Sequence, residues 1–300
     1  MAAVTDAKPL TIAILAMGGE GGGVLADWIV DLAEHEGYLA QATSVPGVAQ
    51  RTGATIYYLE LFPESAVHAA GQQPVLALMP VPGEVDVVVA SELMEAGRAV
   101  QRGLVDAQRT TLVISTNRVY SMPERTAMGD GRADSSALLE TCRNAARTTI
   151  SADFASIADG AKSVISAALF GGLAAAGVLP FERQDFEAAI GRGGVGVEPS
   201  LTAFSRGFEA ASHPAPLSSP AVIVPENGPR LAQLAARISA EFPAEVRQVL
   251  NAAIQRLTDF QDEAYASSFL DQLAAIKAAD TAPFAVLRET ARYLSLWMSY

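Results

Sequence analysis

The sequence predicts an α/β fold, in which a mostly parallel sheet is flanked by helices, followed by a C-terminal α-helical domain. Short apolar runs alternate with helical periodicity over about the first 210 residues, which indicates βαβ units. The stretch 212–230 contains five prolines and almost no periodicity, as is typical of a linker. Beyond it, apolar residues recur only at helical spacing. We therefore predict an α/β domain over 1–211, a proline-rich linker over 212–230 and a helical domain over 231–300.

The chain opens with a strand, a glycine loop and a helix. Residues 10–16 (LTIAILA) form a nearly continuous apolar run, which suits a central parallel strand buried on both faces. Glycines follow at once in 17–23 (MGGEGGG). Apolar residues then recur at helical spacing, with acidic residues on the opposite face, until Gly37 supplies a helix stop.

The rest of the first domain continues the alternation. Further strands are expected at 54–62, 75–79, 85–90, 111–116 and 149–152. Helices are expected at 94–102, 137–146, 163–176, 183–190 and 199–210. Strands that alternate with helices predict a mostly parallel sheet with right-handed crossovers. The segment 54–62 (ATIYYLELF) alternates better than the others, so we expect it to be antiparallel or near an edge.

The second domain is predicted to contain four helices. Their apolar stripes lie at 231–238, 246–257, 265–276 and 284–297. The last stripe continues to Tyr300 without a Gly, Asn or Pro stop. We expect either that this end packs on a partner or that the chain is the front part of a longer polypeptide, and we favour the second.

Composition excludes several classes of function. The formal net charge is −12 with only three Lys, so we expect neither a nucleic-acid nor a membrane partner. The single Cys142 excludes a disulfide framework, a Cys-based zinc site and an iron–sulfur cluster held by this chain alone. No apolar run approaches the roughly 20 residues that span a bilayer, and the first residues do not resemble a signal peptide. We therefore expect a cytoplasmic protein without a metal site of its own.

The glycine loop has two interpretations. Its glycines let backbone N–H groups approach an anion, and the following helix adds a partial positive charge. Alternatively, the loop is a tight turn that allows close packing of helix on sheet. The loop lacks the third glycine of a dinucleotide fingerprint and the acidic residue that would bind a ribose. Glu20 would repel a phosphate unless its side chain points away or is paired. The candidate binding residues are Gly18, Gly19, Glu20, Gly21, Gly22 and Gly23.

Other candidate residues lie where ligands bind in parallel sheets, at the carboxyl ends of strands. A second loop before the strand 54–62 carries Gln50, Arg51, Thr52 and Gly53, and its Arg either clamps a carboxylate or phosphate or forms a surface ion pair. Ser91 and Glu92 follow the strand 85–90, and Asn117 and Arg118 follow the strand 111–116. Each pair either caps the next element or lines the pocket. No catalytic triad or carboxylate dyad stands out, and we predict no catalytic residue.

The two loops together resemble the gamma-type domain of 2-oxoacid:ferredoxin oxidoreductases. The string from Ala16 to Leu61 most resembles the beta subunit of the indolepyruvate type. Similar strings continue to about residue 210, and they are DVVVASELMEAGRAV, MGDGRAD, SVISAALFGGLAAAGVLPF and GGVGVEPSLTAFSRGF. The resemblance implies a Rossmann-like domain over roughly 10–210. Family members often have Gln at the position of Glu20 and Gly at that of Thr52.

The resemblance also implies a function and partners. Such enzymes decarboxylate a 2-oxoacid on thiamine diphosphate, pass electrons through [4Fe-4S] clusters to ferredoxin, and form an acyl-CoA. In the indolepyruvate type a larger subunit holds the thiamine diphosphate, its magnesium and the clusters. This chain would be the clusterless partner, inactive alone, whose domain lies beside the active site and helps to hold coenzyme A.

Two other functions remain open at this stage. A free-standing Rossmann-like oxidoreductase that binds a nucleotide would use the glycine loop, although the missing glycine and ribose acid argue against it. A non-enzymatic assembly subunit would have its helical C-terminal part as its purpose.

Overall fold

A computed structural model of the chain describes residues 8–45, 54–120, 124, 132–213 and 231–299. The chain divides into two compact units, Met1–Pro216 and Leu217–Tyr300. Within the described residues, no helix has both the length and the apolar character that crossing a membrane requires.

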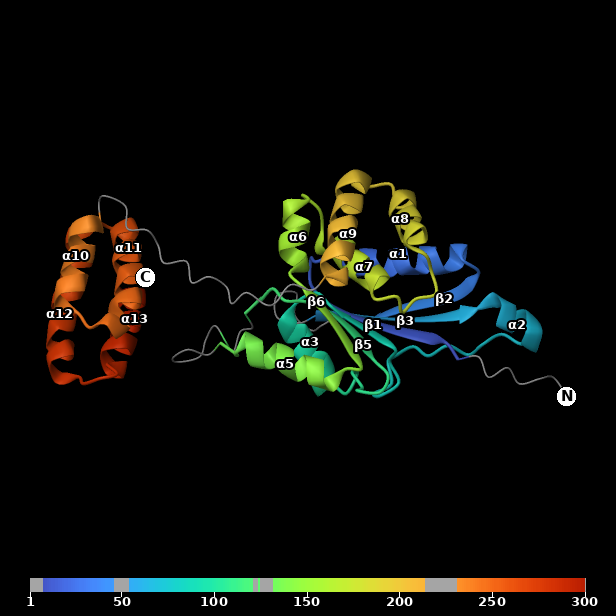
Figure 1. Cartoon of the computed structure of the whole chain (residues 1–300), viewed down its shortest axis with the longest axis horizontal. Helices are drawn as coiled ribbons and strands as arrows, with labels where there is room; N and C mark the ends of the chain where they lie inside the picture. The colour runs from blue at the N-terminus through green and yellow to red at the C-terminus, as the bar shows by residue number, and fades with distance from the viewer. Residues whose placement is uncertain (1–7, 46–53, 121–123, 125–131, 214–230, 300) are drawn as a thin grey trace. The chain divides into compact units, whose positions relative to one another are not determined.

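The first unit contains a six-stranded sheet in the order β2-β3-β1-β4-β5-β6 (Figure 1). The strands are β1 (Leu10–Met17), β2 (Tyr38–Val45), β3 (Ala54–Pro63), β4 (Val87–Ala90), β5 (Thr111–Ser115) and β6 (Thr148–Ala152). The strands β1, β4, β5 and β6 run parallel to one another. β3 pairs antiparallel with both β1 and β2. The predicted α/β fold with a mostly parallel sheet is confirmed. The antiparallel direction expected for the segment 54–62, which lies in β3, is confirmed as well.

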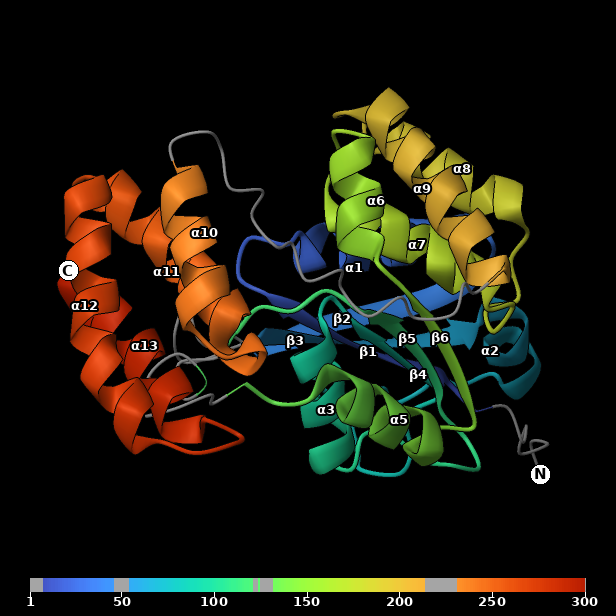
Figure 2. The same ribbon diagram turned by 60° about the vertical axis from the view of Figure 1, so that its left-hand side comes forward.

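Helices cover both faces of this sheet (Figures 1 and 2). On one face lie α1 (Gly22–His35), α6 (Phe154–Gly160), α7 (Ile165–Ala175), α8 (Arg183–Arg192) and α9 (Val197–Ser212). On the other face lie α3 (Leu93–Gln101) and α5 (Ser135–Ala145). Alternate residues of β1 enter the two resulting cores. Ile12 and Ile14 pack with the α1 side, whereas Ala13 and Leu15 pack with the α3 side.

The predicted strand at 75–79 is wrong, because this segment is not part of the sheet. Pro74 and Pro80 flank it, and proline lacks the N–H that a ladder requires. Side chains of the sheet hold its backbone instead. Oε2 of the buried Glu60 accepts a hydrogen bond from the Ala77 N–H at 2.8 Å, and Val75 is 99% exposed. The apolar run therefore lies at the surface.

Among the elements of the first unit given by the described residues, three were not predicted. They are the strand β2 and the short helices α2 (Glu64–Ala70) and α6. The β2 sequence YLAQATSV has no buried residue in this unit, so it lacks the apolar run that marks a central strand. It lies at the edge of the sheet, where such a composition is common.

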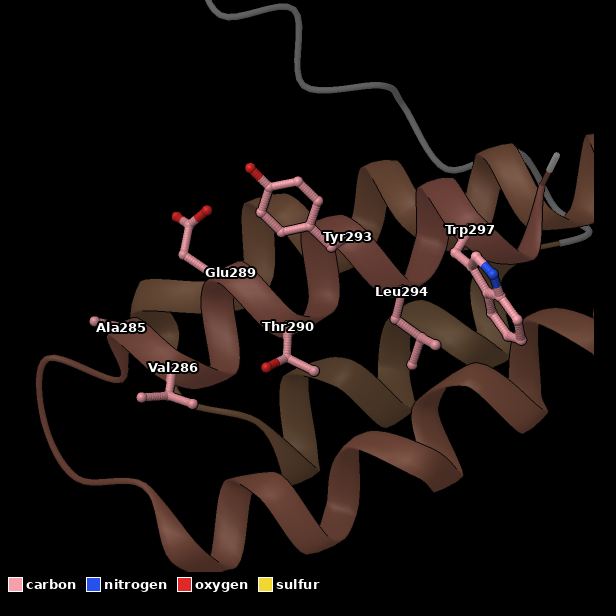
Figure 3. A pocket seen from close by; sticks show the side chains of 7 residues that line it. All are labelled: Ala285, Val286, Glu289, Thr290, Tyr293, Leu294 and Trp297. Carbon is pink, nitrogen blue, oxygen red and sulfur yellow. The ribbon is translucent and has the colours of Figure 1, made fainter. Parts of the chain in front are cut away.

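The described part of the second unit, residues 231–299, contains the four predicted helices and a short 3₁₀ turn. They are α10 (Ala232–Glu241), the turn Ala244–Val246, α11 (Arg247–Phe260), α12 (Glu263–Ala279) and α13 (Ala285–Met298). Leu250, Phe269 and Leu287 belong to their common core. The face of α13 that points away from this core carries Val286, Tyr293 and Trp297, which line a pocket (Figure 3). Trp297 is 77% exposed there.

Candidate functional site

The candidate site lies at the carboxyl ends of the parallel strands β1 and β4. After β1 the chain passes to α1 on one face of the sheet, and after the neighbouring β4 it passes to α3 on the other face. In open α/β sheets such a reversal leaves a crevice at the carboxyl ends of the two strands. The glycine loop after β1 and the pair Ser91–Glu92 after β4 therefore meet at one place.

The glycine loop makes a tight turn into α1. Gly19 and Gly21 have φ angles of 92° and 72°, a region that favours glycine. A Cβ on Gly22 would lie 2.5 Å from Cβ of Ala16 and 2.7 Å from Cε2 of Tyr57, so glycine is required for helix and sheet to pack this closely. No side chain caps α1, which leaves the N–H groups of its first turn available. The loop thus has the packing role and also keeps the donors that anion binding requires.

Glu20 folds back onto the end of the sheet. Its Oε2 accepts hydrogen bonds from the Met17 N–H at 3.2 Å and from the Ser91 hydroxyl. The same Met17 N–H also donates to Oγ of Ser91 at 3.1 Å. The carboxylate is therefore paired between β1 and β4, as the sequence required if this loop is to receive an anion.

Glu92 caps the helix α3. Its Oε1 accepts the Glu95 N–H at 2.7 Å, and its Oε2 accepts the Val119 N–H at 3.3 Å. Glu92 and Glu95 are 1% and 2% exposed, and burial raises the pKa of both carboxyl groups. Glu95 is also paired with Arg98. For Glu92 the structure thus shows a capping role at the edge of the crevice.

Several buried polar atoms at this edge have no hydrogen-bond partner among the described residues. Oγ of Ser115, at the end of β5, and Oδ1 of Asn117 are two of them. Ser166, in the first turn of α7, is the third, and its Oγ lies 2.8 Å from the position that a Cβ on Gly21 would take. A buried polar group without a partner is unfavourable, and such groups gather where a ligand or ordered water completes the bonding.

The structure brings together the candidate residues that it describes. Gly18 to Gly23, Ser91, Glu92 and Asn117 all lie at the carboxyl ends of the parallel strands. Gln50, Arg51, Thr52 and Gly53 fall outside the described residues. Sequence analysis did not select Ser115 or Ser166. Ser166 carries no sequence signal, because only the packing of α7 brings it to the glycine loop.

Arg118 is a further member of this edge. The Leu93 N–H donates to the Asn117 carbonyl oxygen at 3.2 Å, which fastens the chain before Arg118 to the start of α3. Its Nη2 donates to Oε1 of Glu124. Its place directly after a buried strand was the signal in the sequence, but the sequence did not separate a capping from a binding role.

The described residues contain no group of three or more His, Cys, Asp or Glu side chains that could hold a metal ion. Cys142 is buried, and burial raises the pKa of its thiol to about 11. It therefore stays protonated near neutral pH and does not act as a nucleophile. A lone thiol also cannot supply the ligand set of an iron–sulfur cluster. The arrangement suits binding through hydrogen bonds.

The family model for pyruvate ferredoxin/flavodoxin oxidoreductase matches residues 11–210. The chain belongs to this family. A second model, the family of unknown function DUF6537, matches residues 246–300 in the helical unit. No curated protein matches the chain. The family match covers the whole described sheet apart from the first residue of β1, and hence the candidate site.

Three solved structures, each of an oxidoreductase or one of its subunits, are similar to the chain. The pyruvate oxidoreductase subunit PORC of Thermotoga maritima is 18% identical over 67% of this chain and 96% of that chain, with a TM-score of 0.46. The gamma subunit of a keto/oxoacid ferredoxin oxidoreductase of Geobacter sulfurreducens is 16% identical over 67% and 98%, with a TM-score of 0.44.

The third structure is a larger protein. It is the 2-oxoglutarate:ferredoxin oxidoreductase of Magnetococcus marinus with 2-oxoglutarate, coenzyme A and succinyl-CoA bound, and it is 15% identical with a TM-score of 0.48. The match covers 71% of this chain and 32% of that one.

Proposed function

We propose that the chain is the clusterless subunit of an indolepyruvate (arylpyruvate):ferredoxin oxidoreductase. This complex would convert a 2-oxoacid to an acyl-CoA by thiamine-diphosphate-dependent oxidative decarboxylation and pass the electrons to ferredoxin. The observation that carries the proposal is the oxidoreductase family domain over residues 11–210, whose crevice offers hydrogen-bond donors. The carboxylates of Glu20 and Glu92 are engaged in hydrogen bonds of the fold. Under this proposal the chain therefore contributes groups that bind the ligand.

The proposal assigns the reactive groups to a larger partner subunit. That subunit would hold thiamine diphosphate, magnesium and the [4Fe-4S] clusters, because one buried cysteine cannot ligate a cluster. Thiamine diphosphate supplies the carbanion chemistry when it is bound. This chain's part is to form one wall of the site. The uncapped start of α1 and the unpartnered Ser166 beside Gly21 suit a phosphate of coenzyme A.

The proposal also includes the domain organisation expected from the sequence. The family domain would end near residue 211 and the helical domain would begin near 231, joined by the linker 212–230. Each unit has its own apolar core, which is what independent folding requires. Limited proteolysis tests this, and we expect cleavage within 212–230 to yield two fragments that remain folded. Preferential cleavage inside either unit would contradict the division.

Reconstitution tests the assignment of function. We expect the purified chain to be colourless and inactive, and the complex with its larger subunit to oxidise arylpyruvates in the presence of coenzyme A and ferredoxin. Turnover by the isolated chain would overturn the proposal. A higher kcat/KM for pyruvate or 2-oxoglutarate than for indolepyruvate would overturn the substrate class and leave the subunit role in place.

A titration separates this function from nucleotide binding. Binding of NAD, NADP or FAD with micromolar affinity would favour a free-standing nucleotide-dependent oxidoreductase. We expect none, because the glycine loop lacks the third glycine of a dinucleotide fingerprint and the chain lacks the acidic residue that would bind a ribose.

A further inference from the structure

The guanidinium of Arg118 is buried at the candidate site and is only partly bonded. Its side chain is 9% exposed, and that of its partner Glu124 is 6% exposed. Nη2 donates to Glu124, whereas Nε and Nη1 are buried without a hydrogen-bond partner among the described residues. The ring of Tyr120 lies 5.6 Å from the guanidinium carbon, which attracts the charge but accepts none of its in-plane N–H groups.

This arrangement is unfavourable for a purely structural ion pair. A buried charge is stabilised in a fold when its remaining hydrogen-bonding groups are also satisfied. Here Glu124 is bonded elsewhere as well, because its Oε1 accepts the Ala133 N–H at 3.1 Å. Arg118 therefore has donors left over that the described part of the chain does not satisfy.

The bond of Arg118 to Glu124 leaves part of the guanidinium for two-point recognition. A guanidinium binds an oxyanion at two points through either Nε with Nη2 or Nη1 with Nη2. Nη2 carries one N–H group on each of these edges, and its bond to Oε1 of Glu124 uses one of the two. Because Nε and Nη1 have no partner among the described residues, release of Glu124 would leave both edges unpaired there.

The position of Arg118 relative to the site is fixed by its neighbours. The Asn117 carbonyl oxygen accepts the Leu93 N–H, and the Val119 N–H donates to Glu92. Arg118 thus stands between two residues that are bonded to the start of α3, at the carboxyl end of β5. An oxyanion bound here would lie at the edge where ligands of parallel sheets bind.

We propose that Arg118 binds a phosphate or carboxylate oxyanion at the carboxyl end of β5, and that Glu124 competes with this oxyanion for the guanidinium. The inference rests on the proposed function only for the origin of the oxyanion. A phosphate would come from a coenzyme A-like ligand and a carboxylate from the 2-oxoacid. In both cases the ligand gains a charge-assisted contact at two points, and the carboxylate of Glu124 competes with it for the same charge.

Calorimetric titration of the full chain tests the proposal, with pyrophosphate in one arm and phenylpyruvate in the other. We expect Arg118→Gln to weaken binding of the responding probe by about tenfold or more, as for other hydrogen bonds to charged groups. We expect Glu124→Gln to strengthen binding several-fold, because the competing carboxylate is removed. The arm that responds identifies the oxyanion as phosphate or carboxylate.

The opposite signs of the two variants separate binding from a structural role. Unchanged affinity in Arg118→Gln, or weaker binding in Glu124→Gln, would overturn the proposal. So would a failure of both probes to bind either the natural chain or Glu124→Gln. If Arg118→Gln does not fold, as circular dichroism would show, Arg118→Lys takes its place. Lysine keeps the charge but has no bidentate edge, so the same loss of about tenfold is expected.

Arg109→Gln is the matched control, since this arginine is also paired with carboxylates but lies before β5. Its affinity for both probes should equal that of the natural chain. The titration needs no partner subunit and no turnover. A flat titration therefore counts against the role of Arg118, whereas an inactive complex counts against the proposed function.

Discussion

The two ends of β5 carry one arginine each, and the two are bonded in different ways. Arg109, before the strand, donates from Nε to Oδ1 of Asp86 at 2.7 Å and from Nη1 to Glu84. Oδ2 of Asp86 in turn accepts from the N–H and the hydroxyl of Thr11, both at 2.9 Å. Arg118, after the strand, is more deeply buried, and yet among the described residues it pairs with one carboxylate, that of Glu124.

The difference separates a structural network from a binding position. At the amino end each oxygen of the Asp86 carboxylate has a partner from another element, so the network ties β1, β4 and β5 together without any outside group. At the carboxyl end Ser115, Asn117 and Arg118 keep buried atoms that have no partner in the part of the chain that the structure describes. By burial alone, Arg118 would be taken as the arginine that matters more for the fold. The hydrogen bonds indicate instead that Arg109 is the structural one.

The largest effect is expected at the carboxyl end of the sheet, where a glycine lets helix and strand pack closely. Gly22→Ala should destabilise the first unit by about 2–3 kcal/mol, because the new Cβ would overlap Ala16 and Tyr57. Gly23→Ala is the control. Its Cβ would meet Tyr57 at an ordinary 3.6 Å, so the better helix propensity of alanine should stabilise α1 by about 0.5–1 kcal/mol. Urea denaturation followed by circular dichroism measures both, and equal effects would contradict the packing argument.

A smaller effect is expected at the amino end. Asp86→Asn should destabilise the first unit by about 1 kcal/mol at neutral pH, because it weakens the hydrogen bonds of Arg109 and Thr11. This loss of stability is small because the side chains of Arg109 and Asp86 are partly exposed, at 28% and 29%. Anion affinity should not change. Altered binding of pyrophosphate in this variant would show that the two ends are not independent.

The smallest effect concerns pH, and the two ends should respond with opposite sign. Although burial acts to raise it, hydrogen bonds from Arg109 and Thr11 hold the pKa of Asp86 below its ordinary value. The stability that Asp86 contributes is therefore present above the unfolded-state pKa of about 4 and is lost as the pH falls through the lower folded-state pKa.

At the carboxyl end, burial raises the pKa of Glu92. Its contribution therefore declines as the pH rises from the unfolded-state pKa of about 4.3 to the higher folded-state pKa. Between about pH 3 and pH 6 the penalty of Asp86→Asn should grow with rising pH. That of Glu92→Gln should shrink over the same range. Denaturation midpoints measured across this range check the signs, and parallel slopes in the two variants would contradict them.

Sequence reasoning succeeded where one element's own pattern was sufficient. The strand, glycine loop and helix at the start of the chain follow from a continuous apolar run and from helical spacing. It failed for β2, whose residues are only partly buried, and for 75–79, whose apolar side chains point outward between prolines. In both cases the environment of the segment, and not its composition, determines its structure.

The same limit applies to the candidate site. That Ser91, Glu92, Asn117 and the glycine loop would meet followed from chain order, because the carboxyl ends of parallel strands share one edge. The pairing of Glu20 with Ser91 joins residues 71 positions apart, and no local pattern encodes it. The approach of Ser166 to Gly21 depends likewise on how α7 packs.

The two tryptophans of the chain lie in different units and different surroundings. Trp28 is 7% exposed and stacks on Phe170 at 5.7 Å, whereas Trp297 is 77% exposed on α13. Intrinsic fluorescence therefore contains a short-wavelength component from the first unit and a long-wavelength component from the second. An aqueous quencher should remove only the latter. A protein that covers α13 would shift that emission to shorter wavelength, so that assembly at this helix can be followed without any label.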